Sequence, residues 1–228
     1  MKKIILPALL ACTVPLNAQA DTILGVFVGG YAWQTGISGD GELATLGSAT
    51  IDDVYDDETS TVVYAALEHP IPVVPNIRIA QNAVEFEDNT STFDLTSSDI
   101  TLYYEVLDNI VSLDIGLAAR MYSGEYEDTA LPLPFPSPYQ SDIDNTQALA
   151  YAMVRGDLPF TGLALGGQLY AGTDSTSDLN LFVEYETPIG LGFTLGYRAL
   201  ATEVETEDKA ITADVDVDGG YLAVFFHL

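Results

Sequence analysis

The chain has one cysteine, few basic residues, two histidines and, beyond its first twenty residues, no long apolar run. Cys12 alone cannot form an intramolecular disulfide or a multi-thiolate metal site, so neither is expected. Seven Lys and Arg residues stand against 34 Asp and Glu residues, for a formal net charge of −27. Such an acidic surface repels nucleic acid and anionic lipid, so nucleic acid is not an expected partner. No segment after residue 20 is long enough to span a membrane as a helix.

Residues 1–20 have the composition of an export signal that is cleaved. Lys2 and Lys3 are positive, residues 4–14 are mostly apolar, and Ala18-Gln19-Ala20 forms a small-residue cleavage site. The mature chain is therefore expected to begin at Asp21 and to form one domain over residues 21–228.

A second interpretation takes Leu9-Leu10-Ala11-Cys12 as a lipoprotein cleavage box, but it leaves a short signal and an unused cleavage site downstream. Removing Lys2 and Lys3 would change the formal charge from −27 to −29. Five basic residues would remain, namely Arg78, Arg120, Arg155, Arg198 and Lys209.

Apolar and polar residues alternate along much of the chain, most clearly over 111–120, where Val, Leu, Ile and Leu share one parity. In a strand, residues of one parity share a face. The pattern predicts an all-β fold with almost no helix after residue 20. If the mature protein lies in a membrane, only a closed antiparallel up-and-down barrel satisfies its backbone hydrogen bonds. Ten strands are predicted, near 23–34, 59–69, 75–86, 94–106, 110–124, 146–157, 163–173, 178–187, 191–204 and 214–228.

The connections between these strands alternate between two classes. Four are tight and rich in Pro, Gly or Asp-Asn, at 69–75, 107–109, 157–162 and 187–190. The others are longer or strongly polar and acidic, at 35–58, 87–93, 125–145, 174–177 and 205–213. Outer-membrane barrels have short periplasmic turns and long extracellular loops, so both termini are expected in the periplasm. That requires an even number of strands, and eight stays open beside ten.

Residues 131–139 carry alternating prolines, which favour an extended conformation without ladder hydrogen bonds. A stiff surface loop is expected there. A partner-binding finger or an apolar lid over the barrel mouth is the alternative.

The last strand carries apolar residues of one parity up to the terminal carboxylate: Leu222, Val224, Phe226 and Leu228. This pattern looks like the signal read by the outer-membrane barrel-assembly machinery. That signal usually ends in an aromatic residue, and Leu228 departs from it. The machinery and the lipid and lipopolysaccharide of the outer membrane are therefore the expected partners.

The chain resembles a family of small Gram-negative outer-membrane β-barrel proteins that is distantly similar to OmpW-type barrels and is named for a Gly-Gly feature. The resemblance lies in residues 64–72 through Asn76-Ile77-Arg78, in 101–109 and in 157–162, and Gly219-Gly220 would be the Gly-Gly pair. It covers most of the mature chain, mainly at predicted periplasmic turns. The family implies this location and fold but no established reaction or ligand.

Residues 214–219 match the start of an EF-hand calcium loop, but position twelve is Phe225 where that loop needs Glu. The alternation instead predicts a strand whose Asp214, Asp216 and Asp218 face the barrel interior. Because the apolar residues after 220 have the other parity, a β-bulge is expected at Gly219 and Gly220.

The four arginines fall at two predicted heights. Arg78 and Arg155 lie close to periplasmic turns, whereas Arg120 and Arg198 lie eight to ten residues away. Arg155 shares parity with Tyr151 and Met153, which predicts a place near the interface or beyond a bulge. The predicted interior charge cluster comprises Arg78, Arg120, Arg198, Glu68, Glu105, Asp114, Glu184 and Glu186. Its lower part is expected to be a structural ion-pair network, with a cation-attracting constriction as the alternative.

Both histidines, His69 and His227, lie beside predicted periplasmic ends. A histidine-based hydrolase is therefore not expected, and no enzyme activity, cofactor or metal site is predicted. A wide porin is not expected either, because general porins use 16–18 strands. Interior side chains such as Tyr103, Tyr122, Gln168 and Tyr170 are expected to fill most of the lumen. The predicted function is a narrow or partly plugged monomeric barrel that passes or binds small solutes. The alternative is a structural barrel whose acidic loops bind divalent cations, lipopolysaccharide or a partner.

Overall fold

The computed structural model describes residues 24–43, 47–50, 58–131, 134–172 and 176–228. The predicted signal and its cleavage site lie outside the described residues. Eleven strands are present: β1 (Gly25–Leu43), β2 (Gly47–Thr50), β3 (Glu58–Glu68), β4 (Asn76–Glu87), β5 (Ser91–Leu107), β6 (Val111–Asp128), β7 (Tyr139–Leu158), β8 (Leu163–Gly172), β9 (Ser177–Glu186), β10 (Leu191–Glu205) and β11 (Ile211–His227).

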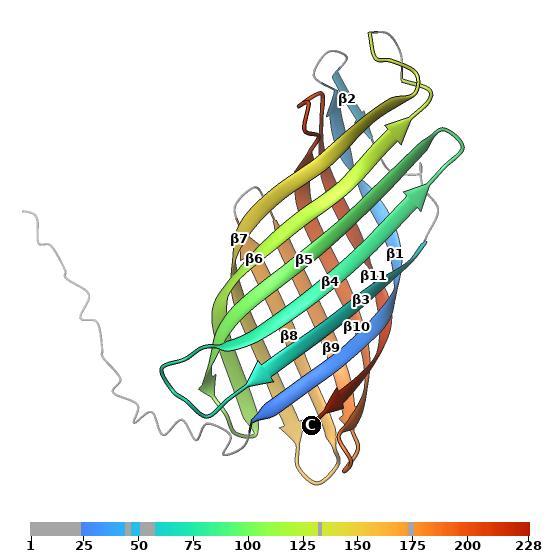
Figure 1. The fold of residues 1–228 in the computed structure, drawn as a ribbon. Coiled ribbons are helices and arrows are strands. Elements are labelled where there is room, and N and C mark those ends of the chain that lie inside the picture. Colours follow the sequence, from blue (N-terminus) through green and yellow to red (C-terminus); the bar gives the residue numbers. More distant parts are fainter. Residues whose placement is uncertain (1–23, 44–46, 51–57, 132–133, 173–175) are drawn as a thin grey trace, which may run out of the picture.

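Ten of these strands form a closed antiparallel barrel (Figure 1). Each strand of the wall pairs with its neighbour in sequence, and β11 closes the ring by pairing with β1. The short β2 folds back on the end of β1 and is not part of the ring. The prediction of a ten-stranded up-and-down barrel is confirmed, and the eight-stranded alternative is wrong. Among the described residues no helix is long and apolar enough to cross a membrane.

The start of β1 and the C-terminus lie at the same end of the barrel, which we call the lower end (Figure 1). At the opposite, upper end the strands run further than the sequence predicted. The turn between β4 and β5 covers only 88–90, so the longer loop predicted at 87–93 is wrong. The β6 and β7 strands likewise extend to Asp128 and from Tyr139. Polar residues that the sequence assigned to loops in these segments therefore belong to strands.

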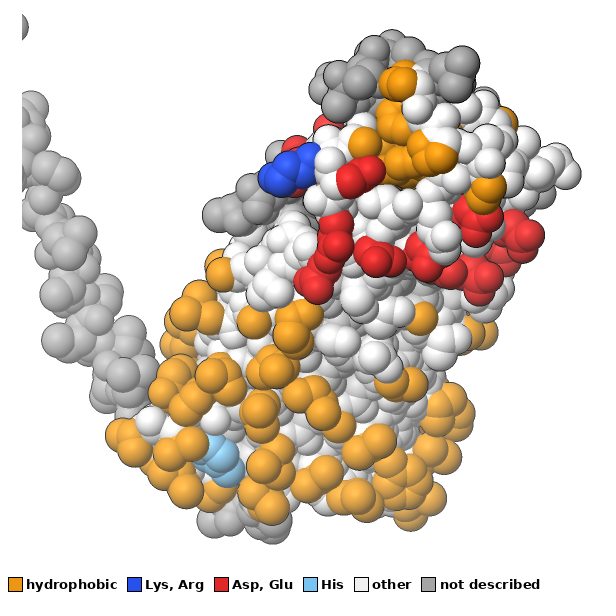
Figure 2. Space-filling view, turned by 45° about the horizontal axis from the view of Figure 1, so that its top comes forward, with side chains coloured by type: hydrophobic (Ala, Val, Ile, Leu, Met, Phe, Trp, Pro, Cys, Tyr) orange, Lys and Arg blue, Asp and Glu red, His pale blue; other side chains and the backbone are white. Residues whose placement is uncertain are grey.

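The lower half of the barrel presents apolar side chains outward. Leu117, Leu195 and Leu222 are 71%, 63% and 69% exposed, although each belongs to a long, regular strand. Figure 2 shows these hydrophobic side chains covering the lower part of the surface, with a band of acidic side chains above them. A contiguous apolar surface of this size is unfavourable in water and favourable against hydrocarbon.

The upper half has the reverse polarity. Trp33, Phe86 and Tyr122 are buried in the interior there. On β11 the valines at 215 and 217 are buried, whereas Asp214, Asp216 and Asp218 are exposed. The apolar side chains of this half gather inside as in a soluble protein, the arrangement that water around the wall favours. We call this apolar core of the upper half the plug; its buried members are Trp33, Val84, Phe86, Phe93, Leu95, Tyr122, Ile143, Leu200, Val204, Val215 and Val217.

The predicted bulge at Gly219 and Gly220 is absent. The register of β11 with β10 continues from Tyr197↔Gly220 to Arg198↔Gly219 without a shift. The prediction that the three aspartates face the interior is therefore wrong. Even-numbered residues of β11 face outward both before and after Gly219, and only their polarity changes. Gly219 has another role: a Cβ there would lie 1.7 Å from the Gln34 carbonyl oxygen. A register shift does occur in the wall, between Glu105 and Leu107.

The four apolar residues of the predicted assembly signal lie on the outer face of the lower half, 42% to 70% exposed. The C-terminal Leu228 exchanges two backbone hydrogen bonds with Val26, at 2.9 and 3.2 Å. Recognition by the assembly machinery stays a prediction. In the described part of the Pro-rich loop, Phe135 packs edge-on against Tyr139, with ring centroids 5.3 Å apart.

Candidate solute-binding cavity

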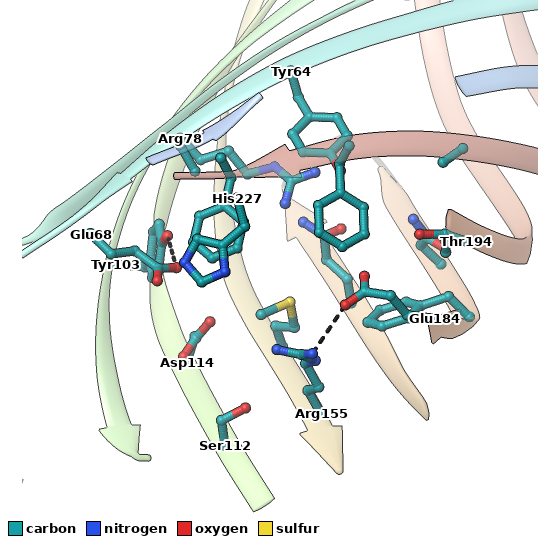
Figure 3. Close-up of a pocket in the computed structure, with 18 of the residues that line it drawn as sticks. Tyr64, Glu68, Arg78, Tyr103, Ser112, Asp114, Arg155, Glu184, Thr194 and His227 are labelled. Atoms are coloured by element: carbon teal, nitrogen blue, oxygen red, sulfur yellow. Dashed lines mark hydrogen bonds and ion pairs between the residues drawn. The ribbon is translucent and has the colours of Figure 1, made fainter. Parts of the chain in front are cut away.

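A cavity of about 210 Å³ occupies the interior of the lower half (Figure 3). Inward-facing residues of all ten strands of the ring contribute to its wall, because residues of one parity on each strand point into the lumen. Aromatic rings and charged groups alternate around it. The charged residues of the wall are Glu68, Arg78, Glu105, Asp108, Asp114, Arg155 and Glu184.

Carboxylates gather on the side of the cavity formed by β3, β5 and β6. Tyr103 donates its hydroxyl hydrogen to Glu68 Oε1 at 2.8 Å, and the Asn76 amide donates to Glu105 Oε1 at 3.4 Å. Asp114 lies directly opposite Glu105 in the ladder, and its side chain is buried in the wall. Among the described residues neither Glu105 nor Asp114 forms an ion pair.

Two arginines line the same cavity and differ in their partners. Arg155 Nη2 lies 3.1 Å from Glu184 Oε1 and 3.1 Å from Asp157 Oδ1. Arg78 stacks on the Tyr64 ring, with its guanidinium carbon 4.3 Å from the ring centre. Its Nε is buried without a hydrogen-bond partner, and within the described chain Arg78 makes no ion pair. Figure 3 shows Arg78 beside Tyr64 and Arg155 pointing toward Glu184.

The position of Arg155 in the cavity wall differs from its predicted position. Arg155 was expected near the interface or beyond a bulge, because it shares parity with Tyr151 and Met153. Those two residues face the interior, and β7 keeps a continuous register with β6 and β8 through Arg155. The lower lumen is lined by aromatic and sulfur-containing side chains as well as charges, so apolar parity did not identify the lipid-facing side.

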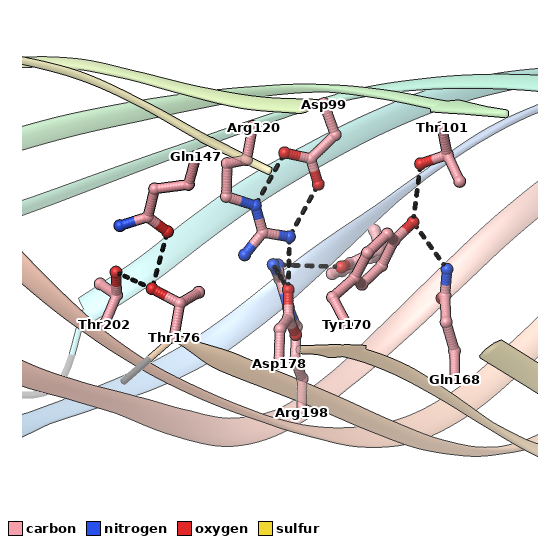
Figure 4. Close-up of polar contacts among 11 residues, drawn as sticks. Asp99, Thr101, Arg120, Gln147, Gln168, Tyr170, Thr176, Asp178, Arg198 and Thr202 are labelled. Atoms are coloured by element: carbon pink, nitrogen blue, oxygen red, sulfur yellow. Dashed lines mark hydrogen bonds and ion pairs between the residues drawn. The ribbon is translucent and has the colours of Figure 1, made fainter. Parts of the chain in front are cut away.

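Above the cavity, a layer of buried ion pairs crosses the lumen, and we call it the septum (Figure 4). Arg120 donates from Nε and Nη2 to the two carboxylate oxygens of Asp99, at 2.8 and 2.7 Å. Asp178 Oδ2 accepts from Nη2 of both Arg120 and Arg198, at 2.7 Å each. The septum therefore joins β5, β6, β9 and β10 across the interior.

Neutral side chains complete the septum. The Gln168 amide donates to the Tyr170 hydroxyl at 3.0 Å, and that hydroxyl lies 3.2 Å from Thr101 Oγ1. Between the septum and the cavity a space of only about 30 Å³ remains, enough for a few waters. The plug fills the lumen above. The prediction that Tyr103, Tyr122, Gln168 and Tyr170 fill the interior is confirmed, since all four are at most 7% exposed.

The structure brings together five of the eight predicted cluster residues at the cavity, namely Glu68, Arg78, Glu105, Asp114 and Glu184. Arg120 and Arg198 lie in the septum instead. Glu186 lies 3.2 Å from His227 Nδ1, and the His227 ring stacks on Phe27 at 4.0 Å. His69 lies in the β3–β4 turn, where its Nδ1 accepts from the backbone N–H of Ile71 at 3.2 Å.

Sequence reasoning missed Asp99, Asp178 and Arg155 as interior charges. Asp99 shares parity with Thr101, Tyr103 and Glu105 along β5. Asp178 likewise shares parity with Glu184 and Glu186 along β9. That shared parity is the signal that could have found both aspartates.

No protein-family model matches the chain, and no curated protein matches it in sequence. Among solved structures, it is similar to a FadL homologue of Pseudomonas aeruginosa at 9% identity and a TM-score of 0.35, covering 90% of both chains. It is also similar to the transport unit of the autotransporter AIDA-I from Escherichia coli, at 8% identity and a TM-score of 0.37, covering 93% of this chain and 92% of the other. Neither similarity carries a functional argument, and the resemblance to the Gly-Gly family stays a prediction.

Proposed function

We propose that this chain is an outer-membrane β-barrel that binds small polar solutes in its lower cavity and is closed above it. The apolar outer surface of the lower half supports a membrane location, since a closed barrel is the β structure that lipid tolerates. The short turns at the lower end support a periplasmic orientation for both termini. The cavity would then open toward the periplasm.

One observation carries this proposal. The lower lumen contains a cavity lined by charged residues, whereas close-packed side chains fill the lumen above it. A conducting pore needs a continuous aqueous path. Here the septum and the plug occupy the lumen between the cavity and the upper end. Small-solute binding at the lower end is therefore better supported than passage through the barrel.

Cysteine labelling tests the arrangement. In a Cys12→Ser background, Ser112→Cys introduces a thiol in the cavity wall and Thr101→Cys introduces one in the fully buried septum. With detergent-solubilised protein and a small sulfonate-bearing thiosulfonate reagent, Ser112→Cys is expected to react rapidly and Thr101→Cys to stay unlabelled. Leu117→Cys, on the outer face, controls for shielding by detergent.

Planar-bilayer recording gives the second test. The wild-type protein is expected to show no steady conductance. A stable ohmic current, or labelling of Thr101→Cys as fast as Ser112→Cys, would show a path through the septum and overturn the closed-barrel proposal. Absence of labelling at Ser112→Cys in folded protein would overturn the cavity itself.

The alternative from the sequence, cation binding by the acidic upper surface, has one observation in its favour. Glu85, Asp94, Glu125 and Asp142 lie directly opposite one another on four adjacent strands. Among the described residues, however, no three acidic or histidine side chains are arranged to hold a metal ion. The cavity is the better supported site, and the absence of enzyme activity stays a prediction.

A further inference from the structure

We infer that the cavity binds an elongated zwitterionic solute, with its anionic group on Arg78 and its ammonium group at Glu105 and Asp114. The inference rests on the proposed solute-binding function and names its substrate class. It comes from the arrangement of charges inside the cavity, where, among the described residues, neither Arg78 nor the opposed Glu105 and Asp114 forms an ion pair.

Arg78 supplies the anion-binding end. A guanidinium carries five N–H donors in a planar fork that matches a carboxylate or phosphate. Within the described chain, Arg78 forms no hydrogen bond or ion pair, and its buried Nε has no acceptor. The guanidinium stacks on the Tyr64 ring, and the Arg78 side chain lines the cavity. Burying a cation in this way is costly unless an anion or ordered water satisfies its donors.

Glu105 and Asp114 supply the cation-binding end. They occupy directly opposite positions on β5 and β6, and both line the cavity. Like charges directly opposite in a ladder destabilise a sheet, so a bound cation would stabilise this pair. An ammonium group has three donors and fits between two carboxylates. Arg155 cannot fill this role in the observed geometry, because it is committed to Glu184 and Asp157.

The two ends lie at different depths of the cavity. Arg78 pairs with Thr101, and Thr101 pairs with Ala118, which lies four residues along β6 from Asp114. At 3.3 Å per residue, the two charged positions are separated by about 13 Å along the strands, before side-chain reach shortens the gap. A solute with several atoms between its charges spans such a separation better than a compact ion does.

The wall between the two ends suits the middle of such a solute. Tyr103 and Tyr151 lie with ring centroids 5.6 Å apart, and Met153 packs against the same cluster. These surfaces bury a hydrocarbon spacer, and aromatic faces attract an ammonium group. A volume of about 210 Å³ accommodates on the order of a dozen waters or non-hydrogen atoms.

Three probes of equal chain length test the inference: 6-aminohexanoate, hexanoate and hexylammonium. Each is titrated by calorimetry into the folded full-length protein in a non-ionic maltoside detergent. The zwitterion is expected to bind about tenfold more tightly than either singly charged probe, because it alone satisfies both ends. Equal or tighter binding of hexylammonium would overturn the inference and leave a cation-binding cavity, so the proposed function would survive.

Two substitutions locate the ends. Arg78→Gln is expected to abolish the preference for 6-aminohexanoate over hexylammonium, and Asp114→Asn to abolish its preference over hexanoate. Lys209→Gln and Asp216→Asn make the same charge changes on exposed residues outside the cavity, and both should leave binding unchanged. If Arg78→Gln does not fold, the ranking of the three probes on the wild-type protein still decides.

If the probes do not bind, cysteine labelling distinguishes failure of the zwitterion inference from failure of the proposed solute-binding function. If none of the three probes binds while Ser112→Cys is labelled, the cavity exists but the zwitterion inference is wrong. If Ser112→Cys is also inaccessible, the solute-binding function fails with it.

Discussion

Arg198 binds Asp178 through two parallel hydrogen bonds, from Nε to Oδ1 at 2.9 Å and from Nη2 to Oδ2 at 2.7 Å. The same Oδ2 accepts from Arg120 Nη2, so this carboxylate bridges two guanidinium groups, of which Arg120 also binds Asp99. Asp178, Arg120 and Arg198 are at most 5% exposed. The pair therefore lies at the centre of the septum and joins β9 to β10 and, through Arg120, to β6.

Asp178→Asn should destabilise the barrel by about 3–5 kcal/mol, because it removes the carboxylate that Arg198 binds in the buried septum and one of the two that Arg120 binds. Guanidinium unfolding of the protein in lipid vesicles, followed by tryptophan fluorescence, measures the change. Asp216→Asn is the control, since it makes the same chemical change at an exposed site. Equal stability of the two variants would contradict a structural role for the septum.

Val217 and Asp216 test the reversed polarity of the upper half. Val217→Asp places an unpaired carboxylate in the plug, where Val217 is 2% exposed, and should prevent the barrel from folding. Asp216→Val changes the neighbouring, exposed position and should alter stability by no more than about 0.5 kcal/mol. The folded fraction is read from electrophoretic mobility with and without heating. A larger folded fraction for Val217→Asp than for Asp216→Val would support the sequence prediction that Asp216 faces the interior.

Asp94 lies in a row of four directly opposed carboxylates on β4 to β7. Asp94→Asn removes two unfavourable neighbours and should stabilise the barrel by about 0.2–1 kcal/mol at low ionic strength. At about 1 M salt the Debye length falls to roughly 3 Å, so the gain should largely disappear. Unfolding at both salt concentrations tests this, with Asp94→Glu as the charge-preserving control. An equal gain in stability at both salt concentrations would indicate a packing effect rather than a charge effect.

Asp208 gives the upper end a pH dependence. Partial burial raises the pKa of its carboxyl, but hydrogen bonds from the Ala210 N–H and from the Thr206 and Tyr139 hydroxyls together hold the pKa below its ordinary 3.8. A lowered folded pKa stabilises the protein above the unfolded value, and this contribution is lost as the pH falls through the folded value.

Wild type should therefore exceed Asp208→Asn in stability by a constant amount above about pH 5, and the difference should shrink below about pH 4. Unfolding midpoints between pH 3 and pH 7 provide the measurement. A difference that grows toward low pH would have the wrong sign for this hydrogen-bonded carboxylate.

The strands of the lower half were predictable because their environment is uniform. Lipid outside selects apolar residues on one parity, and Leu222, Val224 and Phe226 show that parity directly. Prediction failed in two places where the environment changes. The aspartates of 214–218 share the outer face of β11 with Leu222, Val224 and Phe226, and the change from polar to apolar residues along one face led to the prediction of a bulge. Arg155 shares its strand face with Tyr151 and Met153, and these two side chains led to the prediction that this face points outward.

The candidate site was predictable in part. Parity placed Glu68, Arg78, Glu105, Asp114 and Glu184 inside the lumen, and all five line the cavity. Which of them pair was not predictable, because pairing depends on the register between strands. Arg155 pairs with Glu184, whereas Arg78 forms no ion pair with any described residue.

By itself, the sequence determined the all-β class and the residues that share each strand face, because these follow from a period of two and from local turn chemistry. Only the tertiary structure decided which face meets lipid, water or lumen at each height. It also decided which charges neutralise each other. Both outcomes depend on distances between residues far apart in the chain, which closure of the barrel sets.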